Sequence, residues 1–207
     1  MTPVIDRTTY FVTDIESDGP DPARNSMLAF ATVAVRLEDG IVDSFEAVLS
    51  PRPDREQDPR TMTWWATEPE AHALATRDPR DPATVTADFV AWVERFPRPR
   101  AFAARPLFFD GRWIDEYLRA YAGVPLVAPP WEKAPLFSGA GIDIASVMTG
   151  VLGRPWREPL PADWLGDVPH SHAAIDDALG YAHLLLKFLK LGDANAPVLA
   201  DLAEQRS

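Results

Sequence analysis

An apolar segment near the start of the chain, TTYFVTDIE (8–16), ends in two carboxylates. Its β-branched and aromatic residues predict a buried strand, and the period-two alternation of a strand places Asp14 and Glu16 on the same face. Two like charges in an apolar sheet repel each other unless a cation or solvent compensates them. Because other acid-x-acid pairs of the chain lie in polar loops or at a helix start, this pair is a candidate metal site.

A second group of polar side chains lies in VPHSHAAIDDALGY (168–181), at the start of the strongest helical pattern of the chain. His172 and Asp177 are five residues apart, about 140° of rotation on an ideal helix, so one helix cannot present both side by side. We therefore expect Ser171 to be the N-cap, and His172 to lie in the entry loop or first turn, able to swing toward Asp177. Taken alone, Asp177 is equally a first-turn acid favoured by the helix dipole, and His172 a surface residue. His170 is expected on the loop surface.

The third candidate is Asp110 in PLFFDGRWIDEYL (106–118). It follows an apolar run at the start of a predicted helix, where an isolated aspartate is best explained as a cap. Asp115 is an alternative middle carboxylate, but no aromatic residue precedes it. Asp110 therefore gains a chemical interpretation only in combination with the other two groups.

The hydrophobic pattern predicts an α/β framework that must position these side chains. The expected strands are 8–16, 27–37, 41–50, 100–104 and a short one within 135–153; the expected helices are 64–75, 82–96, 108–122, the remainder of 135–153 and 172–191; the loops are 51–60 and 154–170. A meander joined to βα units implies a mixed sheet of about five strands with helices on its faces. We expect the helix over 108–122 to bury one face: Phe109, Trp113, Tyr117 and Leu118.

The composition narrows the class of protein. With 207 residues, 46% of them hydrophobic, we expect one domain over 1–207, with a core over about 8–190 and a tail at 191–207. There is no run of about 18 apolar residues and no basic-then-apolar leader, so we expect a cytoplasmic protein without a membrane partner. The absence of cysteine limits a metal to oxygen or imidazole ligands. A net charge of −11 argues against nonspecific coating of nucleic acid, but not against an enzyme that meets phosphate through metal ions.

Three short motifs together resemble those of the DEDDh 3′-to-5′ exonuclease superfamily, the DnaQ-like or RNase T-like group with an RNase H-like fold. They are DIE in the first strand, FFD entering a middle helix and HAAIDDA opening the last long helix. The resemblance covers about residues 8–190. HAAIDDA is its most specific part, because the family form of His, any residue, small residue, two residues, Asp and Ala is filled by His172, Ala174, Asp177 and Ala178.

The resemblance implies that four carboxylates hold two Mg²⁺ or Mn²⁺ ions and that one histidine is the general base: Asp14, Glu16, Asp110, Asp177 and His172. Hard divalent ions prefer oxygen ligands, and a pair about 4 Å apart can clamp the attacking and leaving oxygens of a phosphoryl displacement. An imidazole with an ordinary pKa of about 6.5 accepts a proton near neutral pH. We also expect the 154–170 loop to close on substrate, bringing His172 in and excluding water.

Two segments match the family only in part. TMTWWATEPEA (61–71) resembles the Trp-Trp segment of a small exoribonuclease subgroup, although Glu68 stands where that subgroup has Gln. Aromatic faces stack on unpaired bases, and adjacent tryptophans on a helix cannot face the same way, so we choose Trp65 to stack and leave Trp64 to the core. The middle motif of the family has an Asn before its aromatic-Asp pair. This chain has Arg105 there, which either contacts phosphate or lies on the surface.

The segment SDGPDPARNSMLA (17–29) follows the first two carboxylates, where the resemblance places the terminal nucleotide. Arg24 would reach a phosphate there. A plain turn explains each residue of the segment equally well. Three further residues would approach the sugar: Ser17, Asp18 and Gly19.

The sequence leaves three functions open. The leading one is a metal-dependent 3′-to-5′ exonuclease that releases nucleoside monophosphates from single-stranded 3′ ends, with RNA slightly preferred over DNA. The alternatives are a catalytically inactive nucleic-acid-binding module and a small-molecule phosphodiesterase that uses the same metal pair. The presence of all five motif residues argues against an inactive module. The oligomeric state stays open, a homodimer included.

Overall fold

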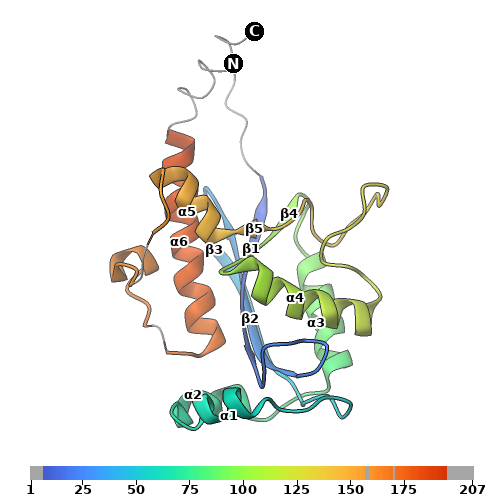
Figure 1. The fold of residues 1–207 in the computed structure, drawn as a ribbon. Helices are drawn as coiled ribbons and strands as arrows, with labels where there is room; N and C mark the ends of the chain where they lie inside the picture. Colours follow the sequence, from blue (N-terminus) through green and yellow to red (C-terminus); the bar gives the residue numbers. More distant parts are fainter. Residues whose placement is uncertain (1–6, 157–158, 170, 195–207) are drawn as a thin grey trace.

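A five-stranded mixed sheet with the strand order β3-β2-β1-β4-β5 forms the centre of the computed structural model, which describes residues 7–156, 159–169 and 171–194 (Figure 1). The antiparallel meander β3-β2-β1 is extended by β4 and β5, which run parallel to β1. This confirms the expected mixed sheet. The strands are β1 (Thr9–Ser17), β2 (Met27–Arg36), β3 (Gly40–Val48), β4 (Arg100–Ala104) and β5 (Ile142–Asp143).

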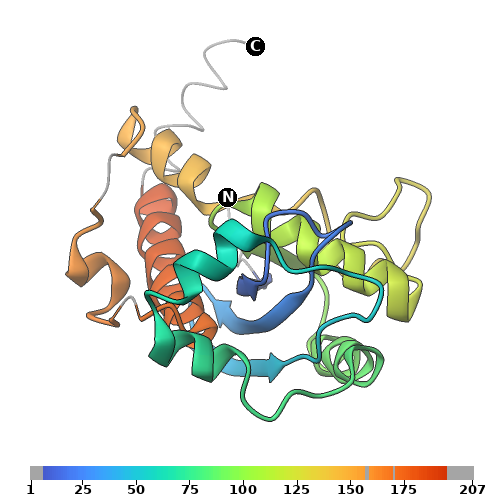
Figure 2. The ribbon, with the colours of Figure 1, turned by 60° about the horizontal axis from the view of Figure 1, so that its bottom comes forward.

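Helices cover both faces of the sheet and one of its ends. Two of them, α5 and α6, lie on one face, and α3 and α4 lie on the other (Figure 1). The short helices α1 and α2 lie across the end of the sheet at which β1 finishes (Figure 2). The helices are α1 (Pro59–Trp65), α2 (Pro69–Ala75), α3 (Pro82–Glu94), α4 (Leu107–Tyr117), α5 (Ile144–Leu152) and α6 (Ala174–Ala194), with a π-helical turn at Leu118–Ala122 and a 3₁₀ turn at Ala162–Leu165.

The side chains of β1 alternate between two hydrophobic clusters, as its sequence predicts. Phe11 and Ile15 pack with α3 and α4, while Tyr10 and Val12 pack with α5 and α6. Burial of each such side chain contributes roughly 1.5–3 kcal/mol, so a register slip that reversed the faces would be costly. The same alternation carries Asp14 to the face that α6 covers.

The expected single helix over 64–75 is wrong, because two helices separated by a break occupy 59–75. The first begins early because Asp58 is its N-cap, with a carboxylate that accepts the backbone N–H groups of Arg60 and Thr61. The second begins at Pro69, which cannot donate the backbone hydrogen bond that a continuous helix requires there. Loop 51–60 therefore ends two residues sooner than expected.

The helix expected over 108–122 is confirmed, but its buried face was assigned partly wrongly. Trp113, Tyr117 and Leu118 are buried, whereas Phe109 is 36% exposed. Phe109 belongs to the first turn of α4, where it lines a cavity with Glu16 and Trp64. The four-residue spacing of Phe109, Trp113 and Tyr117 places them on one face of the helix, but the core covers that face only from Trp113 onward.

Residues 159–169, the described part of the second half of the predicted loop, are less irregular than expected. Their 3₁₀ turn carries Trp164, whose ring packs edge-on against Phe188 of α6 at 5.3 Å between centroids. His170, expected on the loop surface, lies outside the described residues, as does the tail from residue 195. None of the helices in the described ranges is both long and apolar enough to cross a membrane.

Candidate metal centre and nucleotide-binding cavity

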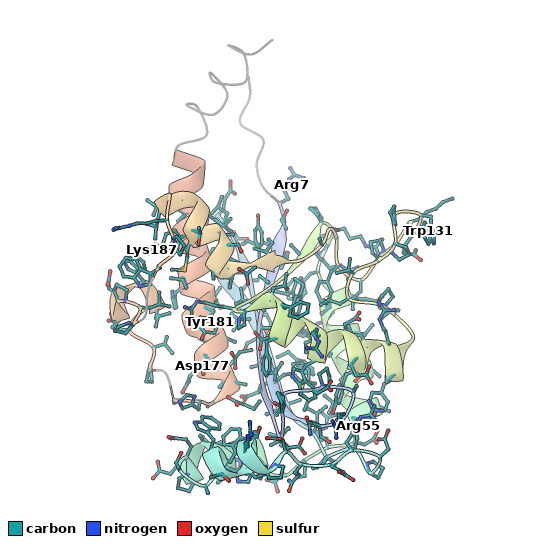
Figure 3. All side chains as sticks on the ribbon, viewed as in Figure 1. Arg7, Arg55, Trp131, Asp177, Tyr181 and Lys187 are labelled. Carbon is teal, nitrogen blue, oxygen red and sulfur yellow. The ribbon has the colours of Figure 1, made fainter. Side chains whose placement is uncertain are left out.

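Three carboxylates meet where β1 ends beneath the first turn of α6. Asp14, Glu16 and Asp177 each place a carboxylate oxygen within 4.8 Å of the other two. All three side chains are buried, with 9%, 9% and 6% of their surface exposed. Asp177 lies on α6 one turn before Tyr181 (Figure 3). Of the four carboxylates that the sequence predicts to converge, these three lie together.

Small residues on α6 allow this convergence. Ala174, Ala178 and Ala182 are buried against β1 and β2, so the helix axis lies close to the sheet. Asp177 lies in the first turn of α6, next to Ala178. Its carboxylate therefore lies near the end of β1, where Asp14 and Glu16 are. A larger residue at 178 would push α6 away and separate Asp177 from Asp14.

Asp110 is a neighbour of Asp14 but does not belong to the group of three whose oxygens lie within 4.8 Å of one another. It is the fourth residue of α4, is 3% exposed, and adds the strongest of the neighbouring charges that raise the pKa of Asp14. It does not cap α4, whose N-cap is Pro106. Asp115, the alternative middle carboxylate, is wrong: its oxygens bind the Arg119 side chain and the Leu126 N–H, both at 2.7 Å.

Burial and mutual repulsion make these carboxyl groups weak acids. Burial raises the pKa of Asp14 well above its usual range, and the charges of Asp110, Glu16 and Asp177 raise it further. Burial, followed by the charges of Asp177 and Asp110, raises the pKa of Glu16 to about 8. Burial raises the pKa of Asp110 to about 7, although backbone hydrogen bonds oppose the rise. The ionised cluster is therefore strained unless a cation compensates it.

The residues present fit divalent metal ions. The donor set consists of oxygen atoms only, as Mg²⁺ and Mn²⁺ prefer. One carboxylate oxygen of Asp110, Oδ2, is buried and has no hydrogen-bond partner among the described residues. A buried, unpaired carboxylate oxygen is costly, and coordination to a cation would remove that cost.

The raised pKa values predict that the metal-free protein loses stability as pH rises. Glu16 and Asp110 release their protons near pH 8 and 7 in the folded chain, but near 4.3 and 3.9 when unfolded. Between about pH 4 and pH 8 the folded state therefore binds more protons than the unfolded state. The free energy of unfolding is then highest at the acid end of this range and falls until about pH 8. Thermal unfolding in chelator should show Tm falling from pH 5 to pH 8. Glu16→Gln should flatten the slope, and a Tm that rose over this range in the unaltered protein would contradict the electrostatic description.

His172 stands outside the helix, as the five-residue spacing predicts. Helix α6 begins at Ala174, and His172 has a left-handed backbone with φ +55°. A left-handed non-glycine residue costs on the order of 1 kcal/mol, which the surrounding contacts must offset. The expectation that Ser171 is the N-cap is wrong, because Ala173 immediately precedes the helix and the Ser171 hydroxyl donates instead to Asp176, at 2.5 Å.

The two tryptophans of α1 have the opposite burial from that expected. Trp65 borders the cavity beside Glu16, but it is only 1% exposed and its indole N–H donates to the Ser17 carbonyl at 2.9 Å, so almost none of its ring is available to a base. Trp64 is 40% exposed and lines a cavity of about 240 Å³ together with Glu16 and Phe109. Propensity could not decide between neighbouring tryptophans, because the anchor of Trp65 lies 48 residues away.

The three residues expected to approach the sugar, Ser17, Asp18 and Gly19, do not all face the same way. Ser17 and Gly19 line the cavity beside Glu16, and the Ser17 hydroxyl donates to the Gly19 carbonyl. Asp18 is 1% exposed and its carboxylate accepts the Ser26 N–H at 2.6 Å, so the expectation that Asp18 approaches the sugar is wrong. Its role is to close the loop after β1.

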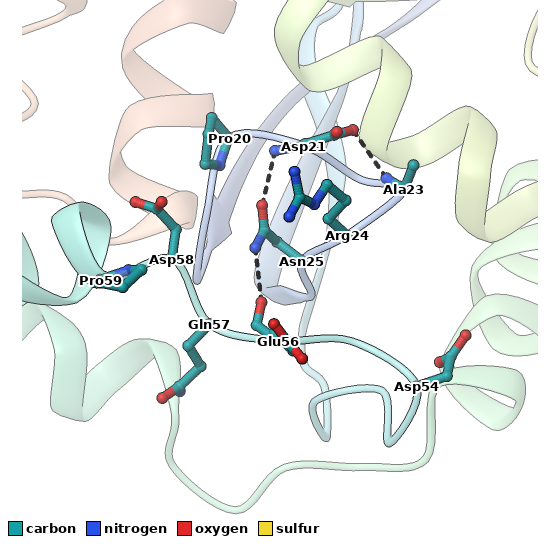
Figure 4. Close-up of a pocket in the computed structure, with 10 residues that line it drawn as sticks. All are labelled: Pro20, Asp21, Ala23, Arg24, Asn25, Asp54, Glu56, Gln57, Asp58 and Pro59. Carbon is teal, nitrogen blue, oxygen red and sulfur yellow. Dashed lines mark hydrogen bonds between the residues drawn. The ribbon is translucent and has the colours of Figure 1, made fainter.

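Arg24 lines a different cavity, of about 640 Å³, between this loop and the segment before α1 (Figure 4). Asn25 spans the same cavity wall, since its side chain accepts the Asp21 N–H and donates to the Glu56 carbonyl (Figure 4). Pro20 lines both this cavity and the one beside Glu16. Several acidic side chains also line that cavity, and they would repel a phosphate. The predicted contact of Arg24 with phosphate stays a prediction.

Arg105 lies between β4 and α4, with its guanidinium carbon 5.4 Å from the centroid of the Tyr181 ring. Burial raises the pKa of Tyr181 to about 12, and the charge of Asp14 raises it while that of Arg105 lowers it. Tyr181 is therefore an electrostatic neighbour of the carboxylate cluster. The predicted contact of Arg105 with phosphate stays a prediction.

Gly19 leaves the space that Asn25 occupies. A Cβ atom on Gly19 would lie 2.2 Å from the Asn25 Cγ atom, so Gly19→Ala should break the Asn25 hydrogen bonds and cost about 1–3 kcal/mol. Gly150→Ala is the matched control, since its Cβ would meet nothing within 4 Å and should stabilise α5 by up to about 1 kcal/mol. Urea unfolding measures both, and equal midpoints for the two variants would refute the packing argument.

The comparisons with known proteins place the fold. The sequence matches no family model and no curated protein. E. coli exonuclease I in complex with a dT13 oligonucleotide is similar in structure, with a TM-score of 0.62 and 19% identity over 94% of this chain and 43% of that chain. The chain therefore spans less than half the length of exonuclease I.

Two further solved structures are similar along most of their length. The nuclease domain of 3′hExo, a DEDDh family member bound to rAMP, has a TM-score of 0.60 and 12% identity over 92% of this chain and 94% of that chain. A 3′-exonuclease described with the histone mRNA stem-loop has a TM-score of 0.59 and 10% identity over 88% and 81%. The chain therefore has the RNase H-like fold of the DEDDh 3′-to-5′ exonucleases.

Proposed function

We propose that the protein is a divalent-metal-dependent 3′-to-5′ exonuclease that releases nucleoside monophosphates from single-stranded nucleic acid. The observation that carries the proposal is the convergence of Asp14, Glu16 and Asp177, with Asp110 beside them. One of these carboxylates, Glu16, also lines a cavity that aromatic side chains border. Structural ion-pair networks elsewhere in proteins alternate charges of opposite sign. A buried group of carboxylates alone favours a metal-dependent reaction instead.

The four carboxylates would hold two Mg²⁺ or Mn²⁺ ions, which when bound supply the positive charge that lowers the pKa of water and offsets charge on phosphate oxygens. His172 then accepts the proton of the attacking water at an imidazole nitrogen. Its place in a loop, rather than on α6, suits a group that moves a proton instead of binding the metal. Closure of the 154–170 loop, anchored on α6 through Trp164, would exclude water during this step.

The cavity beside Glu16 suits an unpaired base. Trp64 and Phe109 supply its exposed aromatic surface, and Ser17 and Gly19 line it together with Glu16. Stacking of bases on aromatic rings is sequence-tolerant, which is what an enzyme that trims 3′ ends requires. The slight preference for RNA rests on the Trp-Trp segment that resembles the exoribonuclease subgroup. The rAMP bound by the similar nuclease domain agrees with a nucleotide product.

End-labelled substrates test this function directly. We expect 5′-labelled single-stranded RNA and DNA incubated with Mn²⁺ to yield ladders that shorten from the 3′ end, with nucleoside 5′-monophosphates as products. Chelator should stop the reaction, and blunt duplexes should be poor substrates. Binding without cleavage would instead indicate an inactive module, and cleavage of dinucleotides or small phosphodiesters alone would indicate a small-molecule phosphodiesterase.

A further inference from the structure

Helix α1 is fixed to the end of β1, so its exposed tryptophan has a defined position. The buried Trp65 indole donates to the Ser17 carbonyl, one residue after Glu16. The Asp58 N–H that precedes α1 donates to the Asp18 carbonyl at 2.8 Å. These two bonds hold both ends of the seven-residue helix against the last residue of β1, the strand that carries the first two carboxylates, and against the residue that follows it.

From this helix, Trp64 touches both the cavity and the candidate general base. Its ring lines the cavity beside Glu16, and its centroid lies 5.3 Å from that of His172, with an interplanar angle of 88°. Edge-to-face contact between rings is a favourable geometry. One side chain therefore joins the surface available to a base with the imidazole, which is held in a left-handed backbone conformation.

We propose that Trp64 is a positioning residue that couples the presence of the 3′-terminal base to the placement of His172, an inference that rests on the proposed exonuclease function. A base stacked on the exposed part of the indole restricts the rotation of the Trp64 side chain. The restricted ring then holds the imidazole in one orientation, while an unstacked indole allows several. The base thus contributes to proton transfer, beyond its contribution to affinity.

Kinetics with paired substrates test the coupling. One oligonucleotide carries a normal 3′-terminal nucleotide and its partner a 3′-terminal abasic sugar. In the unaltered protein, loss of the base should lower kcat by about 5- to 150-fold, a range that corresponds to the stacking of one base. In Trp64→Ala the two substrates should have kcat values within about twofold of each other, and Trp64→Phe should restore part of the difference.

A matched control separates this coupling from general damage. Trp131 is 80% exposed on a loop that projects away from α6, so Trp131→Ala should keep the full difference between the two substrates (Figure 3). A purely structural role for Trp64 would lower kcat on both substrates and preserve their ratio. A preserved ratio in Trp64→Ala would therefore overturn the proposal.

NMR gives a readout that does not depend on turnover. In protein loaded with Mg²⁺, the His172 ring resonances, identified among four histidines with His172→Gln, should shift on addition of adenosine monophosphate and much less with ribose 5-phosphate. Trp64→Ala should remove the difference. Equal shifts with both ligands would overturn the coupling, whereas an absence of 3′ trimming in the unaltered protein would overturn the proposed function alone.

Discussion

Replacing Asp14 with asparagine should lower the hydrolysis of 3′ ends by about 10³-fold or more and weaken Mn²⁺ binding in the same variant. Asp14 lies on β1, and one of its carboxylate oxygens is within 4.8 Å of those of both Glu16 and Asp177. Loss of one ligand charge from a shared site removes several kcal/mol of stabilisation of the developing phosphate charge, and each 1.36 kcal/mol is tenfold in rate. Single-turnover hydrolysis and calorimetric titration with Mn²⁺ measure the two effects.

Loss of the fold would not explain such a result. The Asp14 substitution relieves repulsion among buried carboxylates, so the metal-free variant should unfold at the same or a higher temperature at pH 8. Asp115→Asn is the matched control, because Asp115 binds Arg119 and the Leu126 N–H away from the cluster. It should keep the Mn²⁺ affinity of the unaltered protein. An Asp14→Asn variant with unchanged Mn²⁺ affinity would show that the ligand assignment is wrong.

Replacing His172 with alanine should separate proton transfer from metal binding. General acid–base catalysis by a positioned side chain contributes about 10²- to 10⁴-fold, so kcat should fall by that factor. Mn²⁺ affinity should stay within about twofold, since the cluster is made of carboxylates. His183→Gln, on α6 six residues beyond Asp177, is the control and should preserve both kcat and Mn²⁺ affinity.

A large loss of Mn²⁺ affinity in His172→Ala would place the imidazole among the metal ligands. A fall in kcat smaller than about tenfold would instead assign the proton transfer to another group. Either result would change the role of His172 without touching the assignment of Asp14. The two variants therefore test separate parts of the site.

Local periodicity was enough to predict the parts of the site that lie within one element. The alternation along β1 places Asp14 and Glu16 on one face, and the 100° step of a helix excludes His172 from the face of Asp177. Both features depend only on backbone geometry, which is the same in every protein. The meander and the parallel additions follow equally from strand and helix patterns.

The features that the sequence did not predict depend mostly on contacts between residues far apart in the chain. Trp65 is in the core because the Ser17 carbonyl accepts its indole N–H, and nothing near Trp65 in the chain indicates that partner. Asp18 turns inward to the Ser26 N–H for a similar reason. The break between α1 and α2 had a local signal in Pro69, which the apolar pattern over 64–75 outweighed. Phe109 is partly exposed because it lies in the first turn of α4, where it lines the cavity beside Glu16.

The claim that four carboxylates hold a pair of divalent cations is tested most directly by anomalous diffraction from crystals soaked with Mn²⁺ and a nucleoside monophosphate. We expect two anomalous peaks per chain at coordination distance, about 2.1 Å, from oxygens of Asp14, Glu16, Asp110 and Asp177. The nucleotide base should lie against Trp64. Saturating Mn²⁺ that leaves no peak among these oxygens, or that binds only elsewhere on the surface, would contradict the account.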